Sequence, residues 1–179
     1  MRTEEIWKTK QLPIILQQFS PRLQKDLKMN YPISSLTKIE SMYIYGEVGS
    51  GKTVRAALML LEILKQSFLN KQVQKFIFIP VPELLQNIKY SYDDNTDKEV
   101  LERYSDVDIL VLDDFGIDKP SDWVLGILYL IINRRYENMK LTIFTSNFSV
   151  EEIAERLGDD RITSRIERMC KIIKKERNF

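Results

Sequence analysis

Residues 46–53 read Gly46-Glu47-Val48-Gly49-Ser50-Gly51-Lys52-Thr53, and the rest of the chain is organised around them. The stretch fits G-x-x-x-x-G-K-[ST], the pattern of a loop whose backbone N–H groups surround phosphate groups. Apolar residues 42–45 before the loop predict a short buried strand, and residues 54–68 after it predict a helix rich in Ala, Leu and Met. This order of strand, loop and helix is the context that the motif needs, so the sequence predicts a nucleotide-binding site.

The residue types of the loop suit a bound triphosphate. The three glycines allow positive φ and a close approach of the backbone to the ligand. Lys52 is expected to reach the β- and γ-phosphates, and the Thr53 hydroxyl is expected to bind Mg²⁺. The predicted nucleotide-binding residues are Gly46, Glu47, Val48, Gly49, Ser50, Gly51, Lys52, Thr53 and Val54.

A pair of acids follows a second apolar segment. Residues 109–112 predict a buried strand, and Asp113 and Asp114 stand at its carboxyl end. Ligands of open parallel α/β sheets lie at this edge of the sheet. We therefore predict that Asp113 holds Mg²⁺ together with Thr53, and that Asp114 orients or polarises the attacking water.

Alternating strands and helices are predicted along the remaining chain. Asn147 ends the predicted strand 141–147, and its amide is expected either to bond the γ-phosphate or the water, or to form a plain turn. Ser20-Pro21 and the capping box at 149–152 mark two helix starts. The predicted strands are 42–45, 75–80, 109–112, 141–147 and 169–173, and the predicted helices are 20–29, 54–68, 82–90, 97–104, 123–138, 149–158 and a short one from 159.

Composition excludes several classes of protein. The 179 residues are 44% hydrophobic and 30% charged with a net charge of +1, which is typical of a single globular domain. The chain has no histidine, so His-based general bases and His metal sites are excluded, and the single Cys170 excludes an internal disulfide. No apolar run reaches membrane-spanning length, and residues 1–5 do not resemble a signal peptide. We expect a cytoplasmic protein.

The sequence does not decide the role of three segments. Residues 1–40 form a predicted N-terminal helical extension of a core at 41–179, and the amphipathic stretch 4–19 covers the nucleotide, docks on a partner or packs on the core. Lys89, Tyr90 and Tyr92 interleave basic and aromatic residues, which suits single-stranded nucleic acid, but ordinary packing explains them too. The basic end at 161–179 likewise suits an acidic partner or a solvated face.

The motifs together resemble a known family. The loop at 46–53 is followed by Leu-Val-Leu-Asp-Asp-Phe-Gly at 110–116, a Ser-Asp-Trp helix start, Thr-Ser-Asn at 145–147 and Arg-Leu-Gly-Asp-Asp-Arg-Ile-Thr-Ser-Arg-Ile at 156–166. This order resembles the AAA+ helicase loaders, the bacterial and phage DnaC/DnaI-like proteins, with the related IstB transposition helpers. The resemblance covers about residues 43–173.

The resemblance implies an AAA+ P-loop NTPase with an α/β fold, an αβα sandwich around a five-stranded parallel sheet. It also implies ATP and Mg²⁺ as cofactors, and ATP hydrolysis between neighbouring subunits. By the same resemblance, Asn147 matches the first sensor. Arg165 matches a finger that enters the ATP site of the next subunit and thus supports self-association, and Arg161 is the neighbouring candidate.

The chain departs from the family pattern in three ways. Asp114 replaces the usual glutamate and is one methylene shorter, so slow hydrolysis is expected. A C-terminal lid domain has no room, so a lid arginine is missing unless Arg177 substitutes for it. Only about 40 residues precede the sheet, whereas full-length loaders often carry a separate helicase-binding domain.

Three functions remain open from the sequence. The first is an ATP-dependent loader that acts on a hexameric DnaB-like replicative helicase and helps to place it on single-stranded DNA. The second is an IstB-like ATPase regulator of transposition, and the third is a nucleotide-dependent adaptor with little turnover.

Overall fold

The chain forms two compact units in a computed structural model. One unit comprises Met1–Ile39 and Val54–Gln74, and the other comprises Glu40–Thr53 and Lys75–Phe179. The structure describes residues 3–31, 38–93, 95–116 and 119–176. Arg177, the proposed substitute for a lid arginine, lies outside the described residues.

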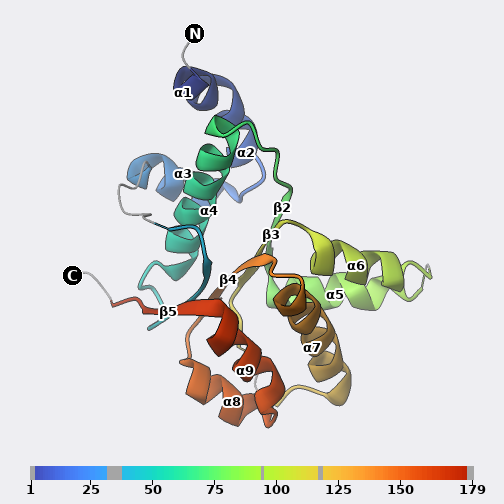
Figure 1. Cartoon of the computed structure of the whole chain (residues 1–179). Helices are drawn as coiled ribbons and strands as arrows, with labels where there is room; N and C mark the ends of the chain where they lie inside the picture. Colours follow the sequence, from blue (N-terminus) through green and yellow to red (C-terminus); the bar gives the residue numbers. More distant parts are fainter. Residues whose placement is uncertain (1–2, 32–37, 94, 117–118, 177–179) are drawn as a thin grey trace. The chain divides into compact units, whose positions relative to one another are not determined.

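A parallel sheet occupies the second unit (Figure 1). Its five strands follow the order β2-β3-β4-β1-β5, and every neighbouring pair is parallel. The strands are β1 Ser41–Tyr45, β2 Phe76–Pro80, β3 Ile109–Asp113, β4 Leu141–Ser146 and β5 Cys170–Lys174. The continuous apolar run of β3 is buried along its whole length, which is typical of a strand covered on both faces. The prediction of an α/β fold with a five-stranded parallel sheet is confirmed.

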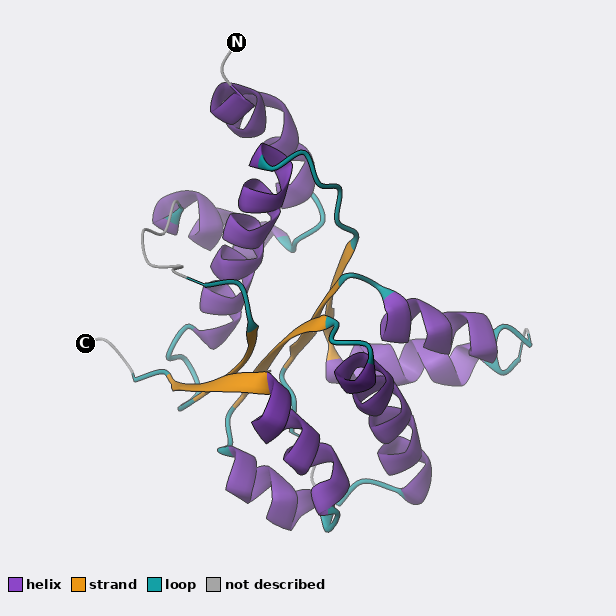
Figure 2. Cartoon of the chain, in the orientation of Figure 1, coloured by secondary structure: helices purple, strands orange, loops and turns teal. Residues whose placement is uncertain are grey.

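The helices of this unit lie close to the predicted ranges, and Figure 2 shows them around the sheet. They are α5 Val81–Ser91, α6 Asp97–Asp106, α7 Asp122–Glu137, α8 Val150–Leu157 and α9 Asp160–Met169. The predicted capping box of α8 is present, because Ser149 and Glu152 each bond the other's backbone N–H. Gly158 ends α8 with a φ of 64°, which a residue with a side chain rarely adopts.

Arg135 is a buried cation in the apolar face of α7 that the periodicity did not predict. Its side chain is fully buried, and its Nη1 donates to the carbonyl oxygens of Tyr104, Ser105 and Val107 at 2.8–3.2 Å. Nε donates to the Thr142 hydroxyl at 2.9 Å, and Nη2 donates to a β4 carbonyl. Burial lowers the pKa of Arg135 to about 10. Arg135 therefore binds the end of α6 to the start of β4.

The first unit contains the helices α1 Thr3–Ile6, α2 Leu12–Leu16 and α3 Pro21–Asn30, the π-helix η1 Trp7–Gln11 and most of α4 Lys52–Leu69. Pro13 explains the π-helix, because a proline ring clashes with the carbonyl four residues earlier and the widened turn relieves that clash. Trp7 is buried, lies 5.7 Å from the Phe68 ring and donates to the Tyr31 hydroxyl. The division into an extension at 1–40 and a core at 41–179 stays a prediction.

Candidate nucleotide site

The predicted site residues come from three neighbouring strands. The loop 46–51 follows β1, Asp113 ends β3, and Asn147 follows β4, which lies between β3 and β1. The carboxyl ends of parallel strands meet at one edge of a sheet, where ligands of such folds bind. Sequence positions that are 60 to 95 residues apart are therefore in contact.

Lys52 begins α4 and is folded back into the loop. Its side chain is 8% exposed, and Nζ donates to Gly46 O at 2.9 Å, Glu47 O at 2.8 Å and Asn147 Oδ1 at 2.8 Å. Burial lowers the pKa of Lys52, and the charge of Asp114 opposes this shift. Three neutral oxygens are a weaker environment for an ammonium group than an anionic phosphate oxygen, so the loop is suited to exchange them for a phosphate.

Asp113 accepts hydrogen bonds from two threonines. Thr53 Oγ1 donates to Asp113 Oδ1 at 2.9 Å, and Thr145 Oγ1 donates to the same oxygen at 2.6 Å. Burial raises the pKa of Asp113 despite both hydrogen bonds. The Thr145 hydroxyl also accepts from the backbone N–H of Asp114 at 3.0 Å. Sequence reasoning missed Thr145, because its role depends on β4 lying beside β3.

The backbone of Asp114, the residue after β3, departs from the extended conformation of that strand. Its φ is 56°, a left-handed conformation that Asp tolerates better than most residues. Asn147 Nδ2 lies 3.5 Å from Asp114 Oδ1 while its Oδ1 accepts from Lys52. The Asn147 amide thus connects the loop lysine to the second acid, which is a geometry that a plain turn asparagine does not need.

The glycines of the loop adopt the backbone that the sequence predicts. Gly46, Gly49 and Gly51 have φ values of 152°, 81° and 84°. At Gly46 a second reason appears, since an added Cβ would lie 2.2 Å from the carbonyl oxygen of Lys175. The N–H of Lys175 also donates to Tyr45 O at 2.6 Å, so the chain just after β5 lies against the first residue of the loop.

The residues present fit a nucleotide with Mg²⁺. The Ser50 hydroxyl is buried in the loop and has no hydrogen-bond partner among the described residues, which leaves a donor for a ligand. No group of three or more Cys, Asp or Glu residues gathers as a ready metal cage in the described part of the chain. Mg²⁺ is usually held by one or two carboxylates together with substrate phosphates and water, and Thr53 and Asp113 supply such oxygens.

Arg165 belongs to a different cluster, on α9. Its Nε donates to Asn133 Oδ1, its Nη1 to Arg161 O at 2.8 Å and its Nη2 to the Tyr129 hydroxyl at 3.3 Å. Arg161 is exposed and pairs with Asp159 at 2.6 Å. None of these contacts involves the loop or Asp113, and the role of Arg165 in the site of a neighbouring copy stays a prediction.

Comparison with known proteins identifies the family. Residues 17–176 match the family described as IstB-like ATP binding protein. The chain belongs to the IstB-like ATP-binding protein family. This IstB-like chain is 29% identical over 117 residues to the replicative helicase loader DnaI of Bacillus subtilis (strain 168), covering 65% of this chain and 36% of that relative. It is 26% identical over 123 residues to the replicative helicase loader DnaC of Escherichia coli (strain K12), covering 68% of this chain and 48% of DnaC.

Solved structures agree with this family. The crystal structure of the DnaC helicase loader matches the IstB-like chain with a TM-score of 0.68 and 25% identity, covering 90% of this chain and 96% of that one. AMPPCP-bound DnaA from Aquifex aeolicus matches with a TM-score of 0.65 and 22% identity, covering 91% and 50%, and supports the fold alone. The predicted similarity to DnaC/DnaI-like loaders and IstB-like proteins is confirmed, and the family description supports ATP as the nucleotide. The chain spans less than half the length of the two curated loaders.

Proposed function

We propose that this IstB-like protein is an ATP-dependent helicase loader, which acts on a hexameric replicative helicase and assists its placement on single-stranded DNA. The observation that carries the proposal is that two replicative helicase loaders are relatives and that the fold covers 96% of the DnaC crystal structure. The geometry of the site supports the ATP dependence of the proposal, because the site contains a phosphate loop, a hydroxyl–carboxylate pair and a second acid.

Each site residue has a role in ATP hydrolysis under this proposal. Lys52 leaves its carbonyl partners and binds the β- and γ-phosphates, while Asn147 holds the γ-phosphate or the water. Thr53 and Asp113 hold Mg²⁺, which neutralises phosphate charge when bound. Asp114 orients the attacking water. Its short side chain reaches less far than glutamate, so turnover is slow.

Arg165 completes the site of a neighbouring copy. A guanidinium group stabilises charge that develops on the γ-phosphate, and supplying it from another subunit makes hydrolysis depend on assembly. Arg165 is held on α9 by α7 rather than by its own nucleotide loop, which supports a role in trans.

A second function is supported by the family match itself. The family description names IstB-like proteins, and the IstB proteins that this sequence resembles are transposition helpers. An ATPase regulator of transposition would use the same nucleotide site, but its partners would be DNA and a transposase. A transposase gene beside the coding gene would favour this alternative.

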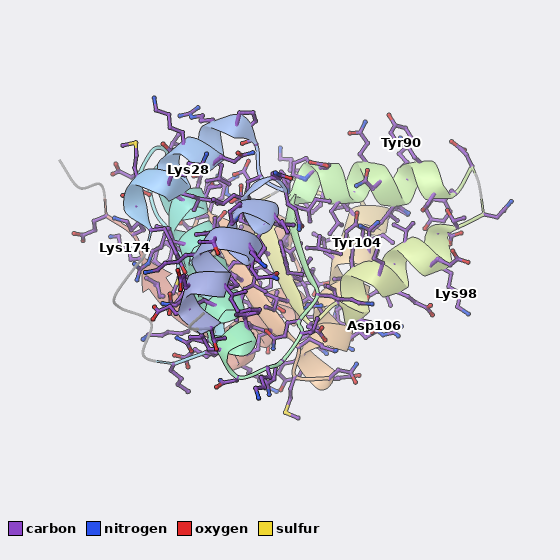
Figure 3. All side chains as sticks on the ribbon, turned by 90° about the horizontal axis from the view of Figure 1, so that it is seen from above. Lys28, Tyr90, Lys98, Tyr104, Asp106 and Lys174 are labelled. Atoms are coloured by element: carbon purple, nitrogen blue, oxygen red, sulfur yellow. The ribbon has the colours of Figure 1, made fainter. Side chains whose placement is uncertain are left out.

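Capture of the host replicative helicase tests the first function. We expect the tagged protein to retain the helicase from solution in the presence of ATP. The Lys52→Ala variant should retain less helicase by a factor of about ten or more, because its phosphate site has lost the cation. Lys98→Ala is the matched control, since Lys98 is exposed on α6 (Figure 3). Equal capture with and without ATP, unchanged by Lys52→Ala, would contradict an ATP-dependent loader.

A further inference from the structure

One aromatic ring on α7 contacts two guanidinium groups of α9, the neighbouring helix (Figure 1). The Cζ atoms of Arg161 and Arg165 each lie 4.9 Å from the centroid of the Tyr129 ring. At this distance the electron-rich face of the ring attracts a cation. The Tyr129 hydroxyl also accepts a hydrogen bond from Arg165 Nη2 at 3.3 Å. Tyr129 therefore holds both arginines at one place.

The charges of this cluster do not balance. Asp159 pairs with Arg161, whereas the partners that the structure gives Arg165 are neutral: the Asn133 amide, the Tyr129 hydroxyl and the backbone carbonyl of Arg161. Two cations one helical turn apart repel each other, so holding them together has an energetic cost. An anion that binds both guanidinium groups would offset this cost and complete the cluster.

We propose that Tyr129 is a positioning residue that presents Arg161 and Arg165 as a pair to the terminal phosphate of ATP bound by a second copy of this chain. The inference rests on the proposed site between subunits and extends it to two cations and the ring that aligns them. The charges are complementary, because the nucleotide site carries Asp113, Asp114 and the phosphates of its ligand. Paired guanidinium groups suit the oxygens of a phosphate.

A ring that only fills space would act differently from a positioning ring. Tyr129 is half-buried, so an aliphatic side chain of similar size can fill its volume on α7. Leucine, however, removes both the cation–π contacts and the hydroxyl acceptor. The proposal therefore predicts that Arg161 and Arg165 are no longer held in position in the Tyr129→Leu variant. The same variant should still fold and bind ATP.

Mixed assemblies separate these effects. The acceptor protein carries Arg161→Ala and Arg165→Ala, so it keeps an intact nucleotide site but no cation for its neighbour. The donor carries Asp114→Asn, so it binds ATP without hydrolysing it and keeps both arginines. We expect the mixture to hydrolyse ATP, and we expect Tyr129→Leu in the donor to lower kcat of the mixture about tenfold or more at unchanged KM, because small misplacements of a catalytic group reduce rates strongly.

Two further donors complete the experiment. Tyr129→Phe keeps the ring and should retain most of the activity, while Tyr136→Leu changes another half-buried tyrosine of α7 and should leave kcat unchanged. ATP affinity of each donor, measured alone, confirms its folding. Full activity with the Tyr129→Leu donor would overturn the positioning role and leave the shared site standing. No activity with the donor that keeps Tyr129 would refute the shared site, and the inference with it.

Discussion

At the residue scale, the environment of Asp113 differs from that of a surface acid. Its carboxylate is buried, and two threonine hydroxyls donate to it. Burial opposes the charged form more strongly than the hydrogen bonds favour it, so the pKa of Asp113 lies above its usual value of 3.8. At pH values above this raised pKa, the buried charge of Asp113 lowers the free energy of unfolding. Protonation of Asp113, as the pH falls through that pKa, removes this destabilisation.

Mg²⁺ binding should show the opposite dependence on pH. The metal needs the ionised carboxylate, so the gain in ATP affinity that Mg²⁺ provides should shrink as pH falls toward the raised pKa of Asp113. Calorimetric titration of ATP with and without Mg²⁺, between about pH 7.5 and pH 5, measures this gain. Asp113→Asn should abolish the gain at every pH, which separates Asp113 from the titration of the ATP phosphates. An Asp113→Asn protein with a normal Mg²⁺ response would remove Asp113 from the site.

At the element scale, the end of β5 supports the phosphate loop. β5 is an edge strand whose only neighbour in the described sheet is β1, and the Lys175 N–H bonds the last residue of β1. The Lys175 carbonyl lies where a side chain of Gly46 would be. The Gly46 carbonyl in turn accepts from Lys52. The backbone after β5 therefore leaves no room for a side chain at Gly46, whose carbonyl oxygen accepts the hydrogen bond of Lys52.

Proline substitutions can test this support. Lys175→Pro removes the N–H that bonds β1 and should weaken ATP binding about three- to tenfold, in line with the net value of one hydrogen bond. Lys174→Pro is the matched control, because successive N–H groups of a strand alternate in direction and that of Lys174 faces the free edge. Lys175→Ala separates the loss of the side chain from the loss of the N–H. Equal ATP affinities of the two proline variants would refute the support.

At the scale of the whole molecule, segments far apart in sequence build an aromatic surface. Tyr90 lies in the last turn of α5, Tyr92 follows that helix, and Trp123 lies in the first turn of α7, with exposed fractions of 59%, 44% and 37%. The rings of Tyr92 and Trp123 lie 6.3 Å apart, and Tyr90 lies on the outer side of α5 (Figure 3). Exposed aromatic rings on which bases can stack support the reading of Lys89, Tyr90 and Tyr92 as a contact for single-stranded DNA.

Binding of an oligothymidine strand tests this surface. The double variant Tyr90→Ala and Tyr92→Ala should lower affinity by about tenfold or more in fluorescence anisotropy, because stacking contributes about 1–3 kcal/mol per base. Tyr136→Ala, which changes a tyrosine outside the surface, should bind normally. The surroundings are acidic, with twelve acidic and four basic residues at 83–122, so we expect only a weak salt dependence. Native affinity in the double variant would assign these rings to packing alone.

None of the described helices is both long enough and apolar enough to cross a bilayer.

Sequence by itself determined the strands, the helices, the phosphate loop and the acid pair of this protein. Each depends on neighbours a few residues away: the glycine spacing at 46–51, the apolar run of β3, and the capping box at Ser149. These local preferences act before distant segments meet, so they can be read from the chain directly.

Tertiary structure alone decided which distant groups meet these elements. Thr145 reaches Asp113 because β4 lies beside β3, and Lys175 lies against Gly46 because β5 lies beside β1. Arg135 is buried because the end of α6 and the start of β4 offer it carbonyl oxygens. Such contacts follow from strand order and helix packing, which no local pattern encodes.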